Sequence, residues 1–267
     1  MQNLKNIAVI ALNTFRESVR SKVLYNIVFL AVALAFFSII LGEWSVFDRA
    51  YVIKSTTLTI MSLSGLLISV FVGISLVQKE IQGRTVLTLL SKPISRAAFI
   101  VGKYFGLVAV IAVHLLLLTV IYYLILWMTH SSPTFSLLFA IYLVFCEMAI
   151  VVALALLFST FSSPVLSALF TLGVYIAGHL SNELLEQVRF VRRMGEVDGT
   201  QSVMMEKIAI VVHAVFPGLY RFNVSAYVIH NIALPEHYLF FNSLYAVGYI
   251  GVFLAIACWW FSRRDFI

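Results

Sequence analysis

The stretch VQKEIQGRTVLTLLSKPISRAAFIVGK, Val77 to Lys103, decides how this chain is interpreted, because it is a polar passage between two long apolar runs. It contains Gly83, which permits a sharp change of direction, and Pro93, which ends a helix. Between them, residues 85–91 carry leucines at helical spacing. The pattern predicts a short amphipathic helix along the membrane surface, suited to docking a partner; the alternative is an ordinary charged loop between two spans.

The composition is that of a membrane protein. Hydrophobic residues make up 62% of the chain and charged residues 11%, whereas a soluble domain has about half and about a quarter. Apolar runs of roughly 20 residues indicate spanning helices. The sequence therefore predicts an all-α polytopic membrane protein with six transmembrane helices: Val23–Leu41, Thr56–Gln78, Phe99–Met128, Phe135–Phe161, Val165–Ser181 and Tyr238–Phe261.

Residues 1–22 are polar and charged, which is not the pattern of a cleavable signal peptide. Their apolar side chains recur at steps of three and four, which predicts an amphipathic helix at the membrane interface. The alternative is the water-exposed end of a longer helix. The stripe consists of Leu4, Ile7, Ala8, Ala11, Phe15 and Val19.

The distribution of Lys and Arg predicts the orientation. These residues gather in the N-terminal segment, in the passage from Val77 to Lys103 and in the tail, so both termini and that passage are expected in the cytoplasm. Residues 182–237 are then extracytoplasmic, and the chain is a multi-pass protein of the cell (inner or plasma) membrane. The net charge of +6 reflects topology and contact with anionic lipid rather than nucleic-acid binding.

The segment 182–237 is expected to contain short helices before the last span. Glu183–Met194 has one apolar face and one charged face, which predicts an interfacial helix. Ile208–Val215 is too short to span and precedes Pro217, which suggests a re-entrant or interfacial hairpin. The alternative is a loop that only stabilises the fold.

Polar residues inside the spans are few: Glu147, His114 and His179. Glu147 either lines a polar pathway or makes a hydrogen bond to a neighbouring helix, and His114 is expected to be a packed, hydrogen-bonded residue. The scarcity of charge favours an amphipathic cargo over an ion channel. Cys146 and Cys258 both fall inside spans, so no disulfide framework is predicted.

The polar passage resembles the conserved stretch of ABC type-two permeases, the membrane subunits of ATP-binding-cassette exporters. The similarity lies in KEIQGRT (79–85), LLSKPISR (89–96) and Gly102-Lys103, with Arg84 as a departure. It extends over essentially the whole chain and includes FPGL (216–219), Phe222-Asn223 and the ending FSRRD (261–265).

The resemblance implies a permease subunit that couples ATP hydrolysis by a separate ATPase to export. Residues 23–267 would form one permease domain, with 79–98 as a cytoplasmic coupling segment. ATP and Mg²⁺ would bind the cytoplasmic ATPase, and this chain would hold no cofactor or metal. A second permease subunit, identical or related, and membrane lipid are the other expected partners. The implied coupling residues are Glu80, Gly83, Thr85, Leu89, Leu90, Pro93 and Arg96, and the candidate pathway or gate residues are Glu147, His179, Pro217, Phe222 and Asn223.

Other classes fit less well. The chain has no G-x-x-x-x-G-K-[ST] loop and no H-E-x-x-H or G-x-S-x-G motif, so it is not expected to be an enzyme. The alternatives are an anchoring or regulatory subunit of an ABC-like complex, or a secondary transporter. Small residues spaced by four are expected to pack helices within one subunit, the alternative being a dimer seam; they are Gly65, Ser69, Gly73, Gly102 and Gly106.

Overall fold

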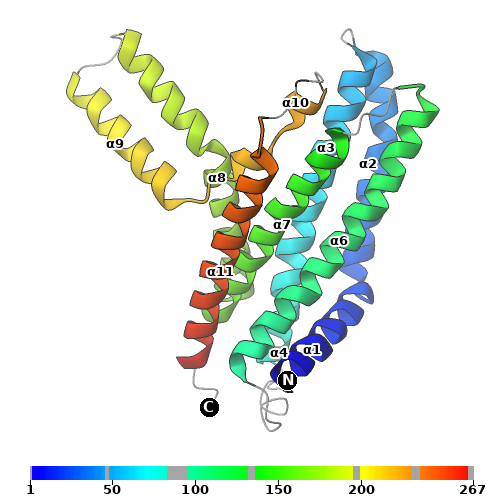
Figure 1. The fold of residues 1–267 in the computed structure, drawn as a ribbon, viewed down its shortest axis with the longest axis vertical. Coiled ribbons are helices and arrows are strands. Elements are labelled where there is room, and N and C mark those ends of the chain that lie inside the picture. Colours follow the sequence, from blue (N-terminus) through cyan, green and yellow to red (C-terminus); the bar gives the residue numbers. More distant parts are fainter. Residues whose placement is uncertain are drawn as a thin grey trace.

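The structure, a computed structural model, describes residues 2–45, 48–82, 95–131, 136–194, 199–229, 232 and 235–263. Within these ranges the regular structure is helical without strands, as the sequence predicts (Figure 1). Six stretches of the described chain are long and apolar enough to cross a membrane, which confirms the predicted all-α polytopic class. They are Lys22–Trp44, Arg49–Lys79, Arg96–Met128, Ser136–Phe161, Pro164–Phe190 and Tyr238–Arg263.

The helices follow one another up and down the bundle. In chain order they are α1 (Gln2–Val19), α2 (Lys22–Trp44), α3 (Arg49–Leu67), the π-helix η1 (Ile68–Val72), α4 (Gly73–Gln82), α6 (Arg96–Met128), α7 (Ser136–Phe161), α8 (Pro164–Met194), α9 (Gly199–Val215), the 3-10 helix η2 (Leu219–Phe222), α10 (Ser225–Ile229) and α11 (Tyr238–Arg263). The start of α1 and the end of α11 lie at one end of the bundle, with the end of α4 and the start of α6 (Figure 1). We term this the basal end and the opposite one the distal end.

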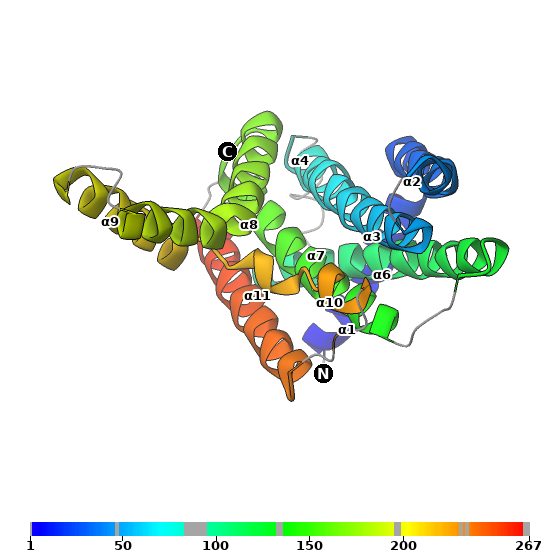
Figure 2. The same ribbon diagram turned by 90° about the horizontal axis from the view of Figure 1, so that it is seen from above.

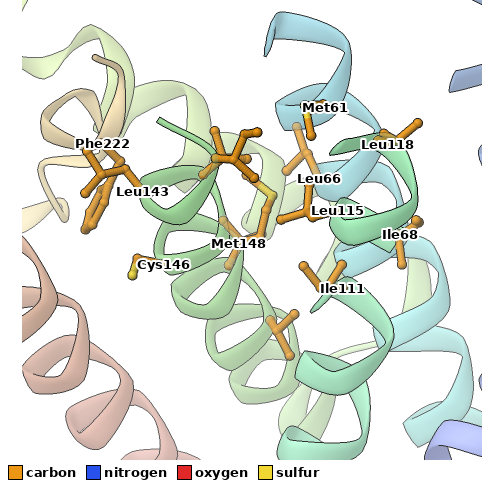
Figure 3. Close-up of a cluster of buried hydrophobic side chains, with 14 of the residues drawn as sticks. Met61, Leu66, Ile68, Ile111, Leu115, Leu118, Leu143, Cys146, Met148 and Phe222 are labelled. Atoms are coloured by element: carbon orange, nitrogen blue, oxygen red, sulfur yellow. The ribbon is translucent and has the colours of Figure 1, made fainter. Parts of the chain in front are cut away.

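The central helix of the bundle is α7. It packs against α3, α4, α6, α8 and α11 (Figure 2). Of the residues in its most apolar 18-residue stretch, 78% are buried, compared with 17% in that of α11. In the core, Met61 and Leu66 of α3 and Leu115 of α6 gather beside Met148 of α7 (Figure 3). The large apolar side chains left exposed on the outer helices suit a lipid environment.

The small residues pack helices within this one chain. A Cβ added at Gly65 would lie 2.9 Å from Cγ of Met148, and one at Gly106 would lie 2.6 Å from the carbonyl oxygen of Ala11. A Cβ added at Gly102 would lie 2.8 Å from Cβ of Ile10. These contacts join α3 to α7 and α6 to α1, so they confirm the expected use of these glycines in packing within a subunit.

The N-terminal helix α1 crosses the base of α6 obliquely (Figure 1). It is a separate helix, because it ends at Val19 and α2 begins at Lys22. Its contact face overlaps the predicted stripe only in part: Ala11 of the stripe lies against α6 together with the buried Thr14, whereas Leu4 is 72% exposed. The physical reason is the absence of side chains at the glycines of α6, which lets a small polar residue come close.

The predicted break between the fifth span and an interfacial helix over Glu183–Met194 is wrong. The structure has one continuous helix, α8, and α9 folds back against it to form a hairpin that projects from the bundle (Figure 1). No Pro or Gly interrupts the chain at this junction, and the side chain of Asn182 donates to Glu186 at 3.1 Å, one turn later. The polar residues therefore extend the helix instead of starting a new one.

Candidate functional site

A cavity of about 250 Å³ opens between α3, α7, α8 and the segment that joins η2 to α10. Four of the candidate pathway residues line it, namely Glu147, His179, Phe222 and Asn223. The remaining wall is a mixture of apolar side chains and hydroxyl groups. It consists of Leu58, Thr59, Ser62, Leu63, Ala140, Val144, Tyr175, Val224 and Ser225.

The cavity contains a carboxylate–imidazole pair whose carboxylate is buried. Oε1 of Glu147 lies 2.6 Å from Nε2 of His179, and their side chains are 2% and 24% exposed. Glu147 is the one charged residue of α7, and a carboxylate in such a helix needs a hydrogen-bonding or charged partner. Glu147 thus bonds a neighbouring helix, one of the two roles considered for it, and its side chain also lines the cavity.

Two further polar side chains extend this pair. The ring of Tyr175 lies one turn before His179 on α8, with 4.6 Å between the ring centroids, and its hydroxyl is 3.2 Å from Oγ of Ser62 on α3. The wall thus connects three helices through polar contacts. Tyr175 was missed from sequence, although its spacing of four residues from His179 places both on one face of a helix.

Pro217 does not line the cavity. A Cβ added at Gly178 would lie 2.6 Å from the carbonyl oxygen of Pro217, so the chain before η2 packs directly on α8. The amide of Gly218 donates to the hydroxyl of Tyr245 at 2.7 Å, which ties the same turn to α11. Pro217 therefore belongs to the support that positions Phe222 and Asn223.

Five of the predicted coupling residues, Gly83, Thr85, Leu89, Leu90 and Pro93, lie outside the described residues. Of the other two, Glu80 falls in the last turns of α4 and Arg96 is the first residue of α6. The structure therefore describes the two helices that frame the predicted coupling segment, both at the basal end.

The helix before the coupling segment is tied to α7 by Gln78. Its side-chain amide donates to the carbonyl oxygens of Ser159 at 3.0 Å and Ser162 at 2.6 Å, and the side chain is buried. The last carbonyls of a helix have no partner within the helix, so this contact satisfies groups at the end of α7. Sequence reasoning treated Gln78 as the end of a span and missed this role.

The helix after the coupling segment is tied to α11 by Arg96. One guanidinium nitrogen donates to the carbonyl oxygens of Ser262 at 2.8 Å and Phe261 at 3.3 Å. The ring of Phe261 stacks on Phe99, with 5.6 Å between the centroids. Arg96, predicted as part of a docking surface, thus bonds the end of another span.

The other polar residue predicted inside a span, His114, is buried and lies 2.8 Å from Oγ of Ser64 through its Nε2 atom, which confirms the packed, hydrogen-bonded role. Cys146 and Cys258 are free cysteines. Among the described residues there is no group of three or more His, Cys, Asp or Glu side chains that could hold a metal ion.

The arrangement at the cavity can bind polar groups and apolar surface together, and the basal ties can move helices together.

A search of curated proteins finds no match. The sequence matches the family described as ABC-2 family transporter protein over residues 8–266, nearly the whole chain. The chain therefore belongs to the ABC-2 transporter family, whose members are membrane subunits of ABC transporters.

Proposed function

We propose that this chain is the permease subunit of an ABC exporter, driven by ATP hydrolysis in a separate cytoplasmic ATPase subunit that holds ATP and Mg²⁺. The observation that carries the proposal is the pair of ties around the coupling segment. Gln78 joins α4 to α7, and Arg96 joins α6 to α11. A force applied to residues 83–94 would reach four helices through hydrogen bonds and packed rings.

The distal cavity supports the choice of an amphipathic substrate. Its wall offers a carboxylate, an imidazole, hydroxyl groups and an amide beside leucine, valine and phenylalanine side chains. Binding sites combine apolar surface with a few placed polar groups in this way. Movement of α7 against α8 would change this cavity, since Glu147 and His179 come from those two helices.

The test is ATP turnover by the purified complex of this chain with its ATPase and a second permease subunit. Glu80→Ala and Leu89→Asp are expected to weaken ATPase binding or to uncouple turnover from the permease. Arg49→Gln, at the distal end of the second span, is the matched control and is expected to behave as the parent protein. Full assembly and unchanged turnover in both coupling variants would refute the assignment.

The proposed orientation has its own test, with both termini in the cytoplasm. Ser45→Cys and Ser262→Cys, each made in a chain with Cys146→Ala and Cys258→Ala, place single thiols at the distal and basal ends. A membrane-impermeant maleimide added to intact cells is expected to label the thiol at position 45 and to leave that at position 262 unlabelled. The reverse result would overturn the orientation while leaving the fold unchanged.

A further inference from the structure

A second hollow, here called the groove, lies at the basal end, between the C-terminal half of α1 and the side of α4. It has a volume of about 650 Å³ and is separate from the distal cavity. Its lining is mostly polar and includes three basic residues. It consists of Asn13, Arg16, Glu17, Arg20, Ser21, Ser75, Leu76 and Lys79.

The groove has an excess of positive charge. Arg16, Arg20 and Lys79 line it with a single acid, Glu17, which lies 3.6 Å from Nζ of Lys79. Among the described residues neither arginine side chain has a hydrogen-bond or ion-pair partner. Like charges that share a groove repel one another, so an anion bound between them would be stabilised.

A helix begins at the same place. Ser21 is the N-cap residue of α2, a helix of 23 residues, and its hydroxyl makes no capping hydrogen bond. The first backbone N–H groups of a helix favour a bound anion, through hydrogen bonds and through the helix dipole. Two arginines, a free hydroxyl and the start of a helix therefore favour one kind of ligand, a phosphate group.

The surface next to the groove indicates where that phosphate comes from. Tyr25 and Phe29 follow Ser21 at steps of four on α2 and therefore share its face, and they are 59% and 76% exposed. An exposed apolar face that begins at a basic groove matches a lipid, with its head group in the groove and its acyl chains along the helix. The groove also lies where the first candidate span starts and the second ends, which is where lipid head groups are expected.

We propose that the groove of Arg16, Arg20, Ser21 and Lys79 binds the phosphate of an anionic phospholipid and so anchors α1 beside the first two spans. A topology signal alone requires only that basic residues lie on one side of the membrane. It does not require that cations from α1 and α4, about sixty positions apart in the chain, line one groove at the start of a third helix. The lipid site does not rest on the proposed coupling to an ATPase; Lys79 is also the first residue of the predicted coupling segment, so the test variants change only Arg16 and Arg20.

The test uses the full chain purified in a neutral detergent. Added dioleoyl-phosphatidylglycerol is expected to raise the midpoint of thermal unfolding, whereas dioleoyl-phosphatidylcholine and inorganic phosphate are not. The double variant Arg16→Gln/Arg20→Gln is expected to lose more than half of that shift. The control Lys5→Gln/Arg49→Gln removes the same charge outside the groove and is expected to keep it.

A second measurement covers a variant that folds poorly. Anionic phospholipid that copurifies from native membranes is counted by mass spectrometry, and Arg16→Lys/Arg20→Lys is expected to retain most of it. Equal shifts with inorganic phosphate and with the lipid would overturn the lipid assignment. So would a double Gln variant that keeps the lipid shift but no longer copurifies with an ATPase, because the groove would then bind an acidic protein surface.

Discussion

The distal cavity and the basal end hold the same helix, α7, in different ways. At the cavity, α7 is joined to α8 by the side chains of Glu147 and His179. At the basal end, the amide of Gln78 binds backbone carbonyls at the end of α7. A side-chain pair in an open cavity can exchange its partner for a polar ligand, whereas a tie to helix-end carbonyls keeps two helices together. We therefore expect α7 and α8 to separate at the distal end, and α4 and α7 to move together at the basal end.

The largest expected effect comes from breaking the distal pair. His179→Leu leaves the carboxylate of Glu147 buried without its imidazole partner, which is expected to lower the free energy of unfolding by about 3 kcal/mol. His179→Gln retains a donor and should cost about 1 kcal/mol. Chemical unfolding of the purified chain in detergent measures both. Equal losses of unfolding free energy in the two variants would show that the hydrogen bond between residue 179 and Glu147 does not stabilise the fold.

Close backbone approaches at the two ends should come next. Gly106→Ala places a Cβ 2.6 Å from the carbonyl oxygen of Ala11, and Gly178→Ala places one 2.6 Å from that of Pro217. Each is expected to cost about 2 kcal/mol, because backbone has to shift. Gly251→Ala on α11 meets no atom within 4 Å and is the control, expected to be neutral or stabilising. The same unfolding measurement decides, and a neutral Gly106→Ala would contradict the α1–α6 contact.

The basal tie of Gln78 is expected to contribute less to stability than to coupling. Gln78→Leu removes two hydrogen bonds to the carbonyls of Ser159 and Ser162 and should cost about 1 kcal/mol. In the complex it should reduce the response of ATP turnover to substrate. Gln78→Glu puts a carboxylate against carbonyl oxygens and is expected to be worse. A Glu variant as active as the parent would argue against this tie.

The smallest effect is expected at an exposed distal ion pair. Arg49 and Glu43 lie 3.0 Å apart, but their side chains are 46% and 59% exposed. Arg49→Gln should therefore change the free energy of unfolding by about 0.5 kcal/mol or less. Arg96→Gln, which removes the bonds to the end of α11, should cost about 1 kcal/mol in the same assay. A larger loss for Arg49→Gln than for Arg96→Gln would mean that the hydrogen bonds of Arg96 contribute little to stability.

The spans were predictable because the apolar run of a spanning helix has about the length of the hydrocarbon core of the membrane. The third and fourth spans begin and end within one turn of their predicted limits, whereas the second begins at Arg49 rather than Thr56. Lys54 lies in that added part and is buried in the structure, which a hydropathy pattern does not anticipate. The length of α8 was also missed, since an amphipathic surface continues a helix when no breaker intervenes.

Two central residues of the candidate site were predictable from the sequence, but their arrangement was not. Glu147 and His179 stand out because polar groups inside a membrane are costly. Their pairing depends on how α7 and α8 face one another, which one sequence does not reveal. The roles of Gln78 and Arg96 were missed for another reason: at the end of a span, polar residues have the same pattern whether they meet water or the end of another helix.

The π-helix Ile68–Val72 has a consequence for the second span as a whole. Ser62, which contacts α8, and Gln78, which contacts the end of α7, are 16 positions apart, so an unbroken α-helix would turn them about 160° away from each other. An i→i+5 turn takes in about one additional residue, which reduces that angle to roughly 60°. The irregular turn thus brings both contacts toward one side, so a single helix can face its two neighbours near both ends of the bundle.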